Sequence, residues 1–247
     1  MTRTVLVTGS SGGIGGAAVR SFAAAGWRTV GIDRRPPRAG AEPDEWAAVD
    51  LADAEGLVGF VRDLCARDEL HAVVNNGAIP LDRAIVDTTD EQWAEVLDIN
   101  VRSAFQTTRE AAAALARTRG AIVNVSSVHA LATSLNVAAY AASKGALLAF
   151  TRAAALELAG DGIRVNAVVP GAVDTPMFRE GLTRRPHPEG AAGNFDEVVR
   201  RTPLGFVADP ALIAEVILFL ADGARSGYVT GQTIVADGGV LAHLSTE

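Results

Sequence analysis

Short apolar segments rich in β-branched residues alternate with longer alanine-rich segments along the chain, and this alternation constrains the fold most strongly. Strands are expected at 4–8, 29–33, 71–75, 121–126, 163–169 and 232–236, and helices near 14–25, 53–67, 90–117, 138–159 and 209–222. Because the strand segments are apolar with little alternation, both faces of their sheet should be covered. The sequence therefore predicts a single doubly wound α/β domain of the Rossmann type, a parallel sheet flanked by helices on both faces.

Size and composition limit the possible functions. The 247 residues fit one such domain, and 49% hydrophobic residues supply a substantial core. The net charge of −7 argues against general affinity for nucleic acid or anionic membranes. No segment resembles a membrane span or a signal peptide, and the single cysteine excludes an internal disulfide and a cysteine-rich zinc site. We expect a cytoplasmic protein with a small-molecule substrate, no metal site, and no nucleic-acid or membrane partner.

Residues 176–208 interrupt the alternation of strands and helices. This segment contains four prolines, several glycines and an arginine pair, and its helical pattern is weak. Regular structure resumes after it, so we interpret it as an irregular insertion of about 176–208 that covers a substrate site. The alternative is a surface excursion without a role.

A glycine-rich turn separates the first expected strand from the first expected helix. Gly9, Gly13 and Gly15 allow a sharp turn and leave room for a pyrophosphate, which the free N–H groups of the following helix can bind. The second expected strand ends in Asp33, 18 residues after Gly15. A carboxylate at this place can hydrogen-bond the hydroxyls of the adenosine ribose and repels a 2′-phosphate. The turn predicts a dinucleotide site, with NAD favoured over NADP.

Two arginines leave the alternative cofactor open. Arg34 and Arg35 follow the aspartate directly, and a guanidinium there could hold the extra phosphate of NADP. The turn itself offers only Ser10, Ser11 and Gly12, none of which is a cation. We therefore expect NAD, with the arginine pair exposed to solvent.

The chain contains one lysine among 21 arginines, and this lysine follows a tyrosine by four residues in "AAYAASKGALLAF" (138–150). On a helix Tyr140 and Lys144 share one face. Lowering the pKa of a phenol by about three units requires ~4 kcal/mol, and an ammonium about 5 Å away supplies roughly 3 kcal/mol at an effective dielectric constant near 20. A compact ammonium can also bond two neighbouring ribose hydroxyls. The pair predicts a proton donor and acceptor for an alcohol or ketone.

A serine at the end of the fourth expected strand joins this pair. Ser127 lies 13 residues before Tyr140, and ligands bind at the carboxyl edge of such sheets. Its hydroxyl could hold the charge that develops on a substrate oxygen. The alternative is an ordinary helix cap or turn residue.

These motifs together resemble the short-chain dehydrogenase/reductase family over almost the whole chain. "TGSSGGIG" (8–15) is similar to the family's T-G-x-x-x-G-x-G turn and "YAASK" (140–144) to its Y-x-x-x-K signature. "NAVVPGAVDTPM" (166–177) resembles the segment that lies along the nicotinamide, and "TGQTIVADGG" (230–239) resembles the last strand. The resemblance implies an NAD(P)-dependent oxidoreductase that acts on CH–OH groups.

The resemblance implies catalytic roles for four residues. Tyr140 would exchange a proton with the substrate oxygen while hydride moves, and Ser127 would hydrogen-bond that oxygen. Lys144 would hold the nicotinamide ribose and lower the pKa of Tyr140. Asn100, in "LDINVRSAF", would position a water that relays protons through Lys144; the alternative is a polar helix residue that anchors its own backbone.

The resemblance also implies a set of cofactor contacts and an assembly. The expected cofactor-binding residues are Gly9, Ser11, Gly13, Ile14, Gly15, Asp33, Asp50, Leu51, Asn76, Gly77, Tyr140, Lys144, Pro170, Gly171, Val173 and Thr175. One departure concerns residues 75–78, which read "NNGA" where the family usually has N-N-A-G, so the turn at Gly77 is expected to differ. The family suggests a homotetramer or homodimer packed through 90–117 and 138–159.

The sequence constrains the substrate less than the reaction. The expected substrate contacts are Ser127, His129, Val137, Phe178 and Arg179, with Leu135 also placed nearby. His129 and Arg179 resemble groups that hold the carboxylate of hydroxy acids, whereas Pro80 and Val137 are apolar where such branches of the family use polar residues. Three further polar residues are expected to be solvated, although they could attract an anion: Arg184, Arg185 and His187.

Three functions remain open. The first is an NAD-dependent dehydrogenase of a secondary alcohol or its ketone, such as a sugar, polyol or hydroxy acid. The second is a reductase of 3-oxoacyl thioesters that uses NADPH, and Asp33 argues against it. The third is a cofactor-binding regulatory protein without turnover, which the presence of all four catalytic candidates disfavours.

Overall fold

The computed structural model of the protein describes residues 2–184 and 186–242. Its centre is a seven-stranded sheet in the order β3-β2-β1-β4-β5-β6-β7, with every neighbouring pair parallel. The strands are β1 (Thr4–Thr8), β2 (Arg28–Asp33), β3 (Glu45–Ala48), β4 (Ala72–Asn75), β5 (Ala121–Val125), β6 (Arg164–Pro170) and β7 (Thr233–Ala236). The six predicted strands are confirmed to within one residue at each end. The sequence did not predict β3, because this short, half-exposed edge strand has no run of β-branched residues.

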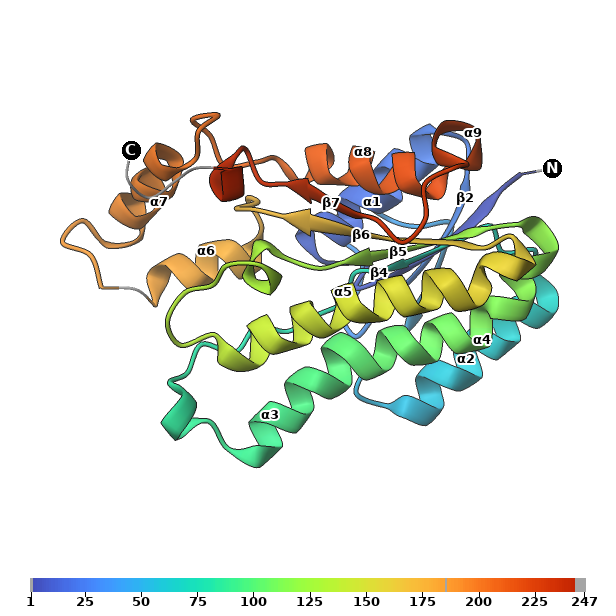
Figure 1. Ribbon diagram of the computed structural model, residues 1–247, viewed down its shortest axis with the longest axis horizontal. Helices are drawn as coiled ribbons and strands as arrows, with labels where there is room; N and C mark the ends of the chain where they lie inside the picture. Colours follow the sequence, from blue (N-terminus) through green and yellow to red (C-terminus); the bar gives the residue numbers. More distant parts are fainter. Residues whose placement is uncertain (1, 185, 243–247) are drawn as a thin grey trace.

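Helices cover both faces of the sheet (Figure 1). One layer contains α1 (Gly13–Ala24), α8 (Pro210–Ala221) and the short α9 (Gly223–Ser226), and the other contains α2 (Ala54–Arg67), α3 (Asp90–Leu97), α4 (Ser103–Thr118) and α5 (Ala138–Leu158). Phe22 and Ile217 are buried in the first layer, and Leu57 and Leu115 in the second. The predicted doubly wound fold is therefore confirmed. None of the described helices combines the length and apolarity that a bilayer span requires.

The strand order reverses at β1. From β1 the sheet continues to β2 and β3 on one side and to β4, β5, β6 and β7 on the other. The connections that leave the carboxyl ends of β1 and β4 therefore run in opposite directions and open a crevice between them. In open α/β sheets this is the place where ligands bind.

The predicted helix at 90–117 is interrupted by a π-helical turn. The helix α3 ends at Leu97, the turn spans Asp98–Arg102, and α4 follows. The turn closes with the N–H of Ser103 donating to the carbonyl oxygen of Asp98. Single π turns inside helices often occur at functional sites, and this one contains Asn100.

The prediction of an irregular segment at 176–208 was wrong, because this segment contains two helices, α6 (Pro176–Thr183) and α7 (Gly190–Arg201). The hydroxyl of Thr175 caps α6, and a proline occupies its first turn. The two helices pack together: Asn194 donates from Nδ2 to the carbonyl oxygen of Leu182 at 2.9 Å, and the rings of Phe178 and Phe195 are 6.2 Å apart. Both helices are amphipathic, and these contacts pack them against each other.

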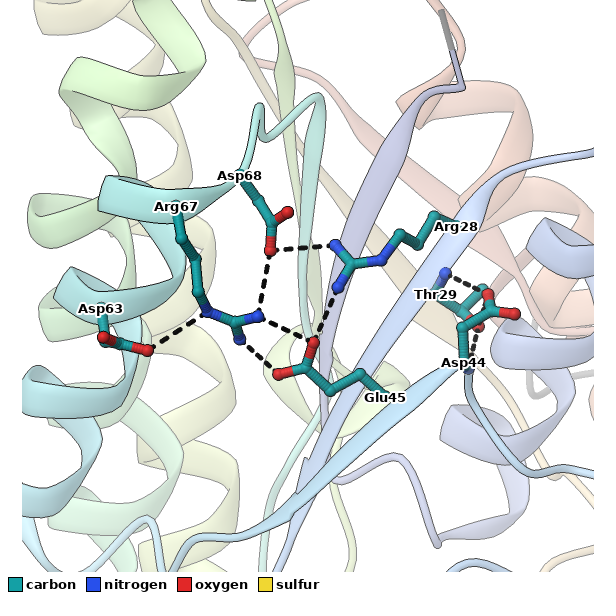
Figure 2. Close-up of polar contacts among 7 residues, drawn as sticks. All are labelled: Arg28, Thr29, Asp44, Glu45, Asp63, Arg67 and Asp68. Carbon is teal, nitrogen blue, oxygen red and sulfur yellow. Dashed lines mark hydrogen bonds and ion pairs between the residues drawn. The ribbon is translucent and has the colours of Figure 1, made fainter.

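An ion cluster ties the β2–β3 edge of the sheet to the end of α2 (Figure 2). Arg28 bonds to Glu45 at 2.7 Å and to Asp68 at 2.9 Å, and Arg67 contacts both carboxylates and Asp63. These side chains are partly exposed, so each pair adds little stability. The cluster lies where β2 and β3 begin, away from the carboxyl ends of the strands where the crevice opens.

Candidate functional site

A cavity of about 460 Å³ opens at the carboxyl edge of the sheet. Most residues predicted from the sequence line it: Gly9, Gly13, Ile14, Asp33, Asp50, Leu51, Asn76, Gly77, Ser127, His129, Val137, Tyr140, Lys144, Pro170, Gly171, Val173, Thr175 and Phe178. Within the described part of the chain, five predicted residues are not among its walls: Ser11, Gly15, Asn100, Arg179 and Leu135. The first three support the walls from behind, whereas Arg179 is engaged elsewhere.

The glycine-rich turn is held in place by contacts with the loop after β4. Gly9 has a φ of +65°, and a Cβ there would lie 2.6 Å from the Cα of Gly77, so a larger residue is excluded. Asn76 donates from Nδ2 to the carbonyl oxygens of Thr8 at 3.0 Å and Gly9 at 3.1 Å. The two loops thus form one rigid unit at the switch point of the sheet.

The amino terminus of α1 faces the cavity without a side-chain cap. Gly12 precedes the helix and supplies no capping hydrogen bond, and the first turn contains no acidic residue. Both Gly12 and Gly13 line the cavity. Free N–H groups at the positive end of a helix dipole bind anions. This end of the cavity therefore fits the diphosphate of a dinucleotide.

Asp33 is buried at the end of β2 and lies between the glycine-rich turn and a group of arginines. Its Oδ2 accepts from the N–H of Ser11 at 3.2 Å and its Oδ1 from the N–H of Arg35 at 3.0 Å. The guanidinium-bearing residues Arg34, Arg35 and Arg38 also line the cavity. The sequence analysis did not identify Arg38, although the third arginine of "RRPPR" was the available signal. The carboxylate and the three arginines therefore line the end of the cavity where the sequence analysis expects the adenosine ribose.

The unusual order "NNGA" has a packing reason. A Cβ on Gly77 would overlap with Cδ1 of Leu51, which is buried against the loop. The glycine at this position therefore makes room for Leu51, and both residues line the cavity. The absence of a side chain at Gly77 thus complements the large side chain of Leu51.

We expect Gly77→Ala to destabilise the protein by about 1 kcal/mol, because the added methyl group overpacks the site until Leu51 changes rotamer. In a Leu51→Ala background the same change should cost much less, because the clashing atom is absent. Denaturant unfolding of the wild type, both single variants and the double variant measures this coupling. Additive effects would contradict the packing explanation.

Tyr140 and Lys144 share one face of α5 inside the cavity, as the spacing predicts. Lys144 is 2% exposed, its Nζ lies 5.6 Å from the centroid of the Tyr140 ring, and it donates to the carbonyl oxygen of Val125 at 2.8 Å. The hydroxyl of Ser126 donates to the carbonyl oxygen of Lys144 at 2.8 Å. Residues at and just after the end of β5 thus hold both the ammonium and the backbone carbonyl group of Lys144.

The predicted lowering of the tyrosine pKa is wrong for the protein chain by itself. Burial raises the pKa of Tyr140 to about 12, although the neighbouring Ser127 side chain lowers it. Burial also lowers the pKa of Lys144 to about 8. Both shifts have the same cause, because removal of water disfavours the charged form of each group. The ammonium of Lys144 lies against the ring of Tyr140. Its attraction for a phenolate does not outweigh the penalty of burying that negative charge.

Ser127 and His129 lie beside the tyrosine. Ser127 follows β5, and its Oγ accepts from the N–H of His129 at 3.2 Å. The imidazole lies 5.8 Å from the Tyr140 ring at an interplanar angle of 75°, and its Nδ1 is 3.1 Å from Oγ1 of Thr133. One wall of the cavity therefore presents a serine hydroxyl, a phenol and an imidazole.

Asn100 connects three segments of the chain behind this wall. Its Oδ1 accepts from the N–H of Ile79 at 2.8 Å, and its Nδ2 donates to the carbonyl oxygen of Ile79 and to Oγ of Ser143, each at 3.0 Å. Ser143 in turn donates to the carbonyl oxygen of Tyr140 at 2.7 Å. The amide therefore anchors the backbone of another loop rather than its own helix, and it aligns that loop with α5.

The substrate end of the cavity differs in part from the prediction. Arg179 bonds through Nε and Nη2 to the two oxygens of Asp174 at 2.5 and 2.6 Å, and Leu135 is 90% exposed. Neither is among the described residues that line the cavity. Several lining residues were not predicted from the sequence: Leu81, Asp82, Met177, Glu180 and Leu182. The available signal was their position, shortly after "NNGA" for the first two and within α6 for the other three. Arg184, expected to be solvated, also lines the cavity, and Arg185 lies outside the described residues.

Comparison with curated proteins identifies relatives over nearly the whole chain. An uncharacterized short-chain type dehydrogenase/reductase of Sinorhizobium fredii is 39% identical over 252 residues, which are 97% of this chain but 44% of that protein. This chain thus spans less than half the length of that relative. Galactitol 2-dehydrogenase (L-tagatose-forming) of Cereibacter sphaeroides is 37% identical, with 94% and 92% covered. The 3-oxoacyl-(acyl-carrier-protein) reductase of Thermotoga maritima is 35% identical, with 97% and 98% covered.

Solved structures and a family model agree with these relatives. Aldohexose dehydrogenase of Thermoplasma acidophilum superimposes with a TM-score of 0.92 at 26% identity, covering 99% of this chain and 96% of that one. A candidate NAD(P)-dependent gluconate 5-dehydrogenase of Beutenbergia cavernae, solved with NADP at low occupancy, gives 0.89 at 33% identity, with 98% and 97% covered. A family model described as enoyl-(acyl carrier protein) reductase matches residues 9–241. With these matches added to its sheet and cavity, the chain belongs to the short-chain dehydrogenase/reductase family of NAD(P)-dependent oxidoreductases.

Proposed function

We propose that the protein is an NAD-dependent oxidoreductase that transfers hydride between nicotinamide and a secondary alcohol or ketone, such as a sugar, polyol or hydroxy acid. The observation that carries this proposal is the convergence of Tyr140, Lys144 and Ser127 on one cavity. The uncapped amino terminus of α1 borders the same cavity and suits a diphosphate. Groups suited to acid–base chemistry thus lie in the same cavity as a helix end suited to the diphosphate of a dinucleotide.

Several residues of the cavity have separate roles in the proposed reaction. The turn at Gly9 and the start of α1 hold the diphosphate, Asp33 holds the adenosine ribose, and Lys144 holds the second ribose. When bound, the nicotinamide supplies the acceptor or donor of hydride. Tyr140 is protonated at neutral pH, because its pKa is raised to about 12, so it can donate its proton to a carbonyl oxygen. Ser127 donates a hydrogen bond to the same oxygen, and in the reverse direction Lys144 stabilises the phenolate.

Asn100 has a positioning part in this proposal. Both hydrogens of its amide group are bonded to protein atoms, on Ile79 and Ser143. It therefore keeps the loop after β4 in register with the turn of α5 that contains Tyr140. The family resemblance implies a proton relay to solvent through Lys144. Because both amide hydrogens of Asn100 are bonded to protein atoms, this relay uses other groups.

The preference for NAD rests on Asp33, and a substitution tests it. We expect Asp33→Ala to shift the ratio of kcat/KM for NAD over NADP toward NADP by at least about tenfold, because the carboxylate no longer repels a 2′-phosphate. The arginines at positions 34, 35 and 38 stay in place and can then bind that phosphate. Steady-state kinetics with both cofactors provides the ratio. An unchanged ratio would contradict the role given to the carboxylate.

The reaction itself is tested by following the absorbance of the reduced nicotinamide with NAD and NADP and their reduced forms. The panel comprises secondary alcohols, sugars, polyols, hydroxy acids and 3-oxoacyl thioesters. We expect turnover of a secondary alcohol with NAD. Turnover confined to thioesters with NADPH would favour the alternative that the Thermotoga maritima relative suggests. Cofactor binding without any turnover would favour a regulatory protein.

Three further properties belong to this proposal. Residues 1–247 form one domain in the cytoplasm, and residues 176–208 close over the substrate.

The protein is a homotetramer or homodimer packed through α4 and α5, which is supported by the exposed apolar side chains of Phe105 on α4 and Leu156 on α5. Light scattering of the wild type and of Leu156→Glu tests the assembly, and a monomeric wild type would contradict it.

A further inference from the structure

The two ends of the cavity differ in charge. At the adenosine end, three arginines (34, 35 and 38) accompany two aspartates (33 and 50). At the other end, the charged residues of the described lining are, besides Lys144, Asp82 in the loop after β4 and Glu180 and Arg184 on and just after α6. Among the described lining residues, cations therefore exceed carboxylates at the adenosine end, whereas at the substrate end the two cations, Lys144 and Arg184, are matched by two carboxylates.

Two of the described arginines near the substrate end already have acidic partners. Arg179 is bonded twice to Asp174, which raises the pKa of the guanidinium and lowers the pKa of the carboxyl. Arg184 has its Nη2 3.7 Å from Oε2 of Glu180. A substrate carboxylate near Arg184 would meet the negative charge of Glu180 and a second negative charge at Asp82. Such arrangements discriminate against one ligand class by repulsion.

The remaining lining of this end suits hydrocarbon and hydroxyl groups. Apolar side chains come from the loop after β4, from the residue before α5 and from α6: Leu81, Val137, Met177, Phe178 and Leu182. The polar groups among them are the hydroxyls of Ser127 and Tyr140 and the imidazole of His129. An alcohol or a polyol can bond to these groups without bringing a charge into the cavity.

On the basis of the proposed function, we infer that the site selects uncharged alcohols and ketones and rejects substrates that carry a carboxylate. This narrows the substrate to polyols, neutral sugars and cyclic or aliphatic secondary alcohols. Hydroxy acids, which the sequence left open, are disfavoured by the charges at positions 82 and 180. The same charges do not oppose the anionic cofactor, because it enters from the arginine end.

Matched substrate pairs test the inference. Galactitol is compared with galactonate, and cyclopentanol with 3-hydroxycyclopentanecarboxylate, at low ionic strength and with NAD. We expect kcat/KM to be at least about tenfold higher for the uncharged member of each pair that is turned over. The preference should shrink at high salt, because salt screens charges at a partly open site. A higher kcat/KM for either acid would overturn the inference.

Binding separates this inference from the proposed reaction. If no member of the pairs is turned over with either cofactor, the proposed reaction fails for these compounds. Isothermal titration of the enzyme–NAD complex with the same compounds still tests the inference, since tighter binding of an acid than of its neutral partner contradicts it. Equal affinity within a pair contradicts it as well.

Variants identify the charges responsible. Glu180→Gln and Asp82→Asn should each reduce the neutral-over-acid ratio about threefold, since one repulsive charge is removed. Glu189→Gln is the matched control: it removes the same charge between α6 and α7, but Glu189 is not among the described residues that line the cavity. The control should leave the ratio unchanged. Equal effects of all three variants would show that only the net charge of the protein matters, against the inference.

Discussion

Tyr140→Phe is expected to lower kcat at least about a hundredfold, because a positioned acid–base group typically contributes 10²- to 10⁴-fold. The change removes one hydroxyl and keeps the ring that lies against His129 and Lys144. Binding of the dinucleotide should be nearly unaffected, since the glycine-rich turn, α1 and Asp33 are intact. The loss should therefore appear in kcat much more than in the affinity for NAD.

Steady-state kinetics and fluorescence titration with NADH measure the two quantities. Tyr228→Phe provides the matched control, because the other tyrosine of the chain is fully exposed and lies outside the cavity lining among the described residues. The control should retain wild-type turnover. A Tyr140→Phe enzyme with normal kcat would remove the tyrosine from the proposed chemistry.

Lys144→Met is expected to abolish most activity and to make the protein more stable at neutral pH. The pKa of Lys144 is lowered by burial from the ordinary 10.5 to about 8. Below pH 8 the folded protein carries a buried ammonium, and the shift corresponds to a cost of about 3 kcal/mol in the free energy of unfolding. Methionine has a similar shape without the charge, and the lost hydrogen bond to Val125 offsets only part of the gain.

The pH dependence distinguishes this explanation from a simple packing effect. Between pH 8 and 10.5 the unfolded chain binds more protons than the folded protein, so the free energy of unfolding of the wild type should rise with pH. The advantage of Lys144→Met should therefore decrease across this window. No other lysine titrates there, and the tyrosines and Cys65 are common to both proteins. Denaturant unfolding at pH 7, 8, 9 and 10 provides the comparison, and a constant difference would refute the assigned cause.

The fold and most of the site could be predicted from local sequence. Apolar runs defined six strands, the glycine turn defined the start of α1, and the four-residue spacing placed Tyr140 and Lys144 on one face of α5. Each of these features depends on residues that are close in the sequence. Local patterns are sufficient when neighbours along the chain determine the geometry.

The errors concern burial and the choice of contact partners. The edge strand β3 depends on pairing with β2, and the helices at 176–208 depend on packing against each other. The pairing of Arg179 with Asp174 turned a predicted substrate contact into a structural one. The pKa of Tyr140 depends on burial, which a sequence does not give. Burial and partner choice are properties of the assembled fold.

The hydrogen bonds of Asn100 have a consequence for the order of folding. This side chain joins residues 21 and 43 positions away along the chain, so its bonds close long loops. A nascent chain that ends before α5 lacks Ser143 and cannot complete the junction. We expect the reactive geometry to mature late, when α5 docks beside the π turn, and only after the sheet has formed around β1 and β4.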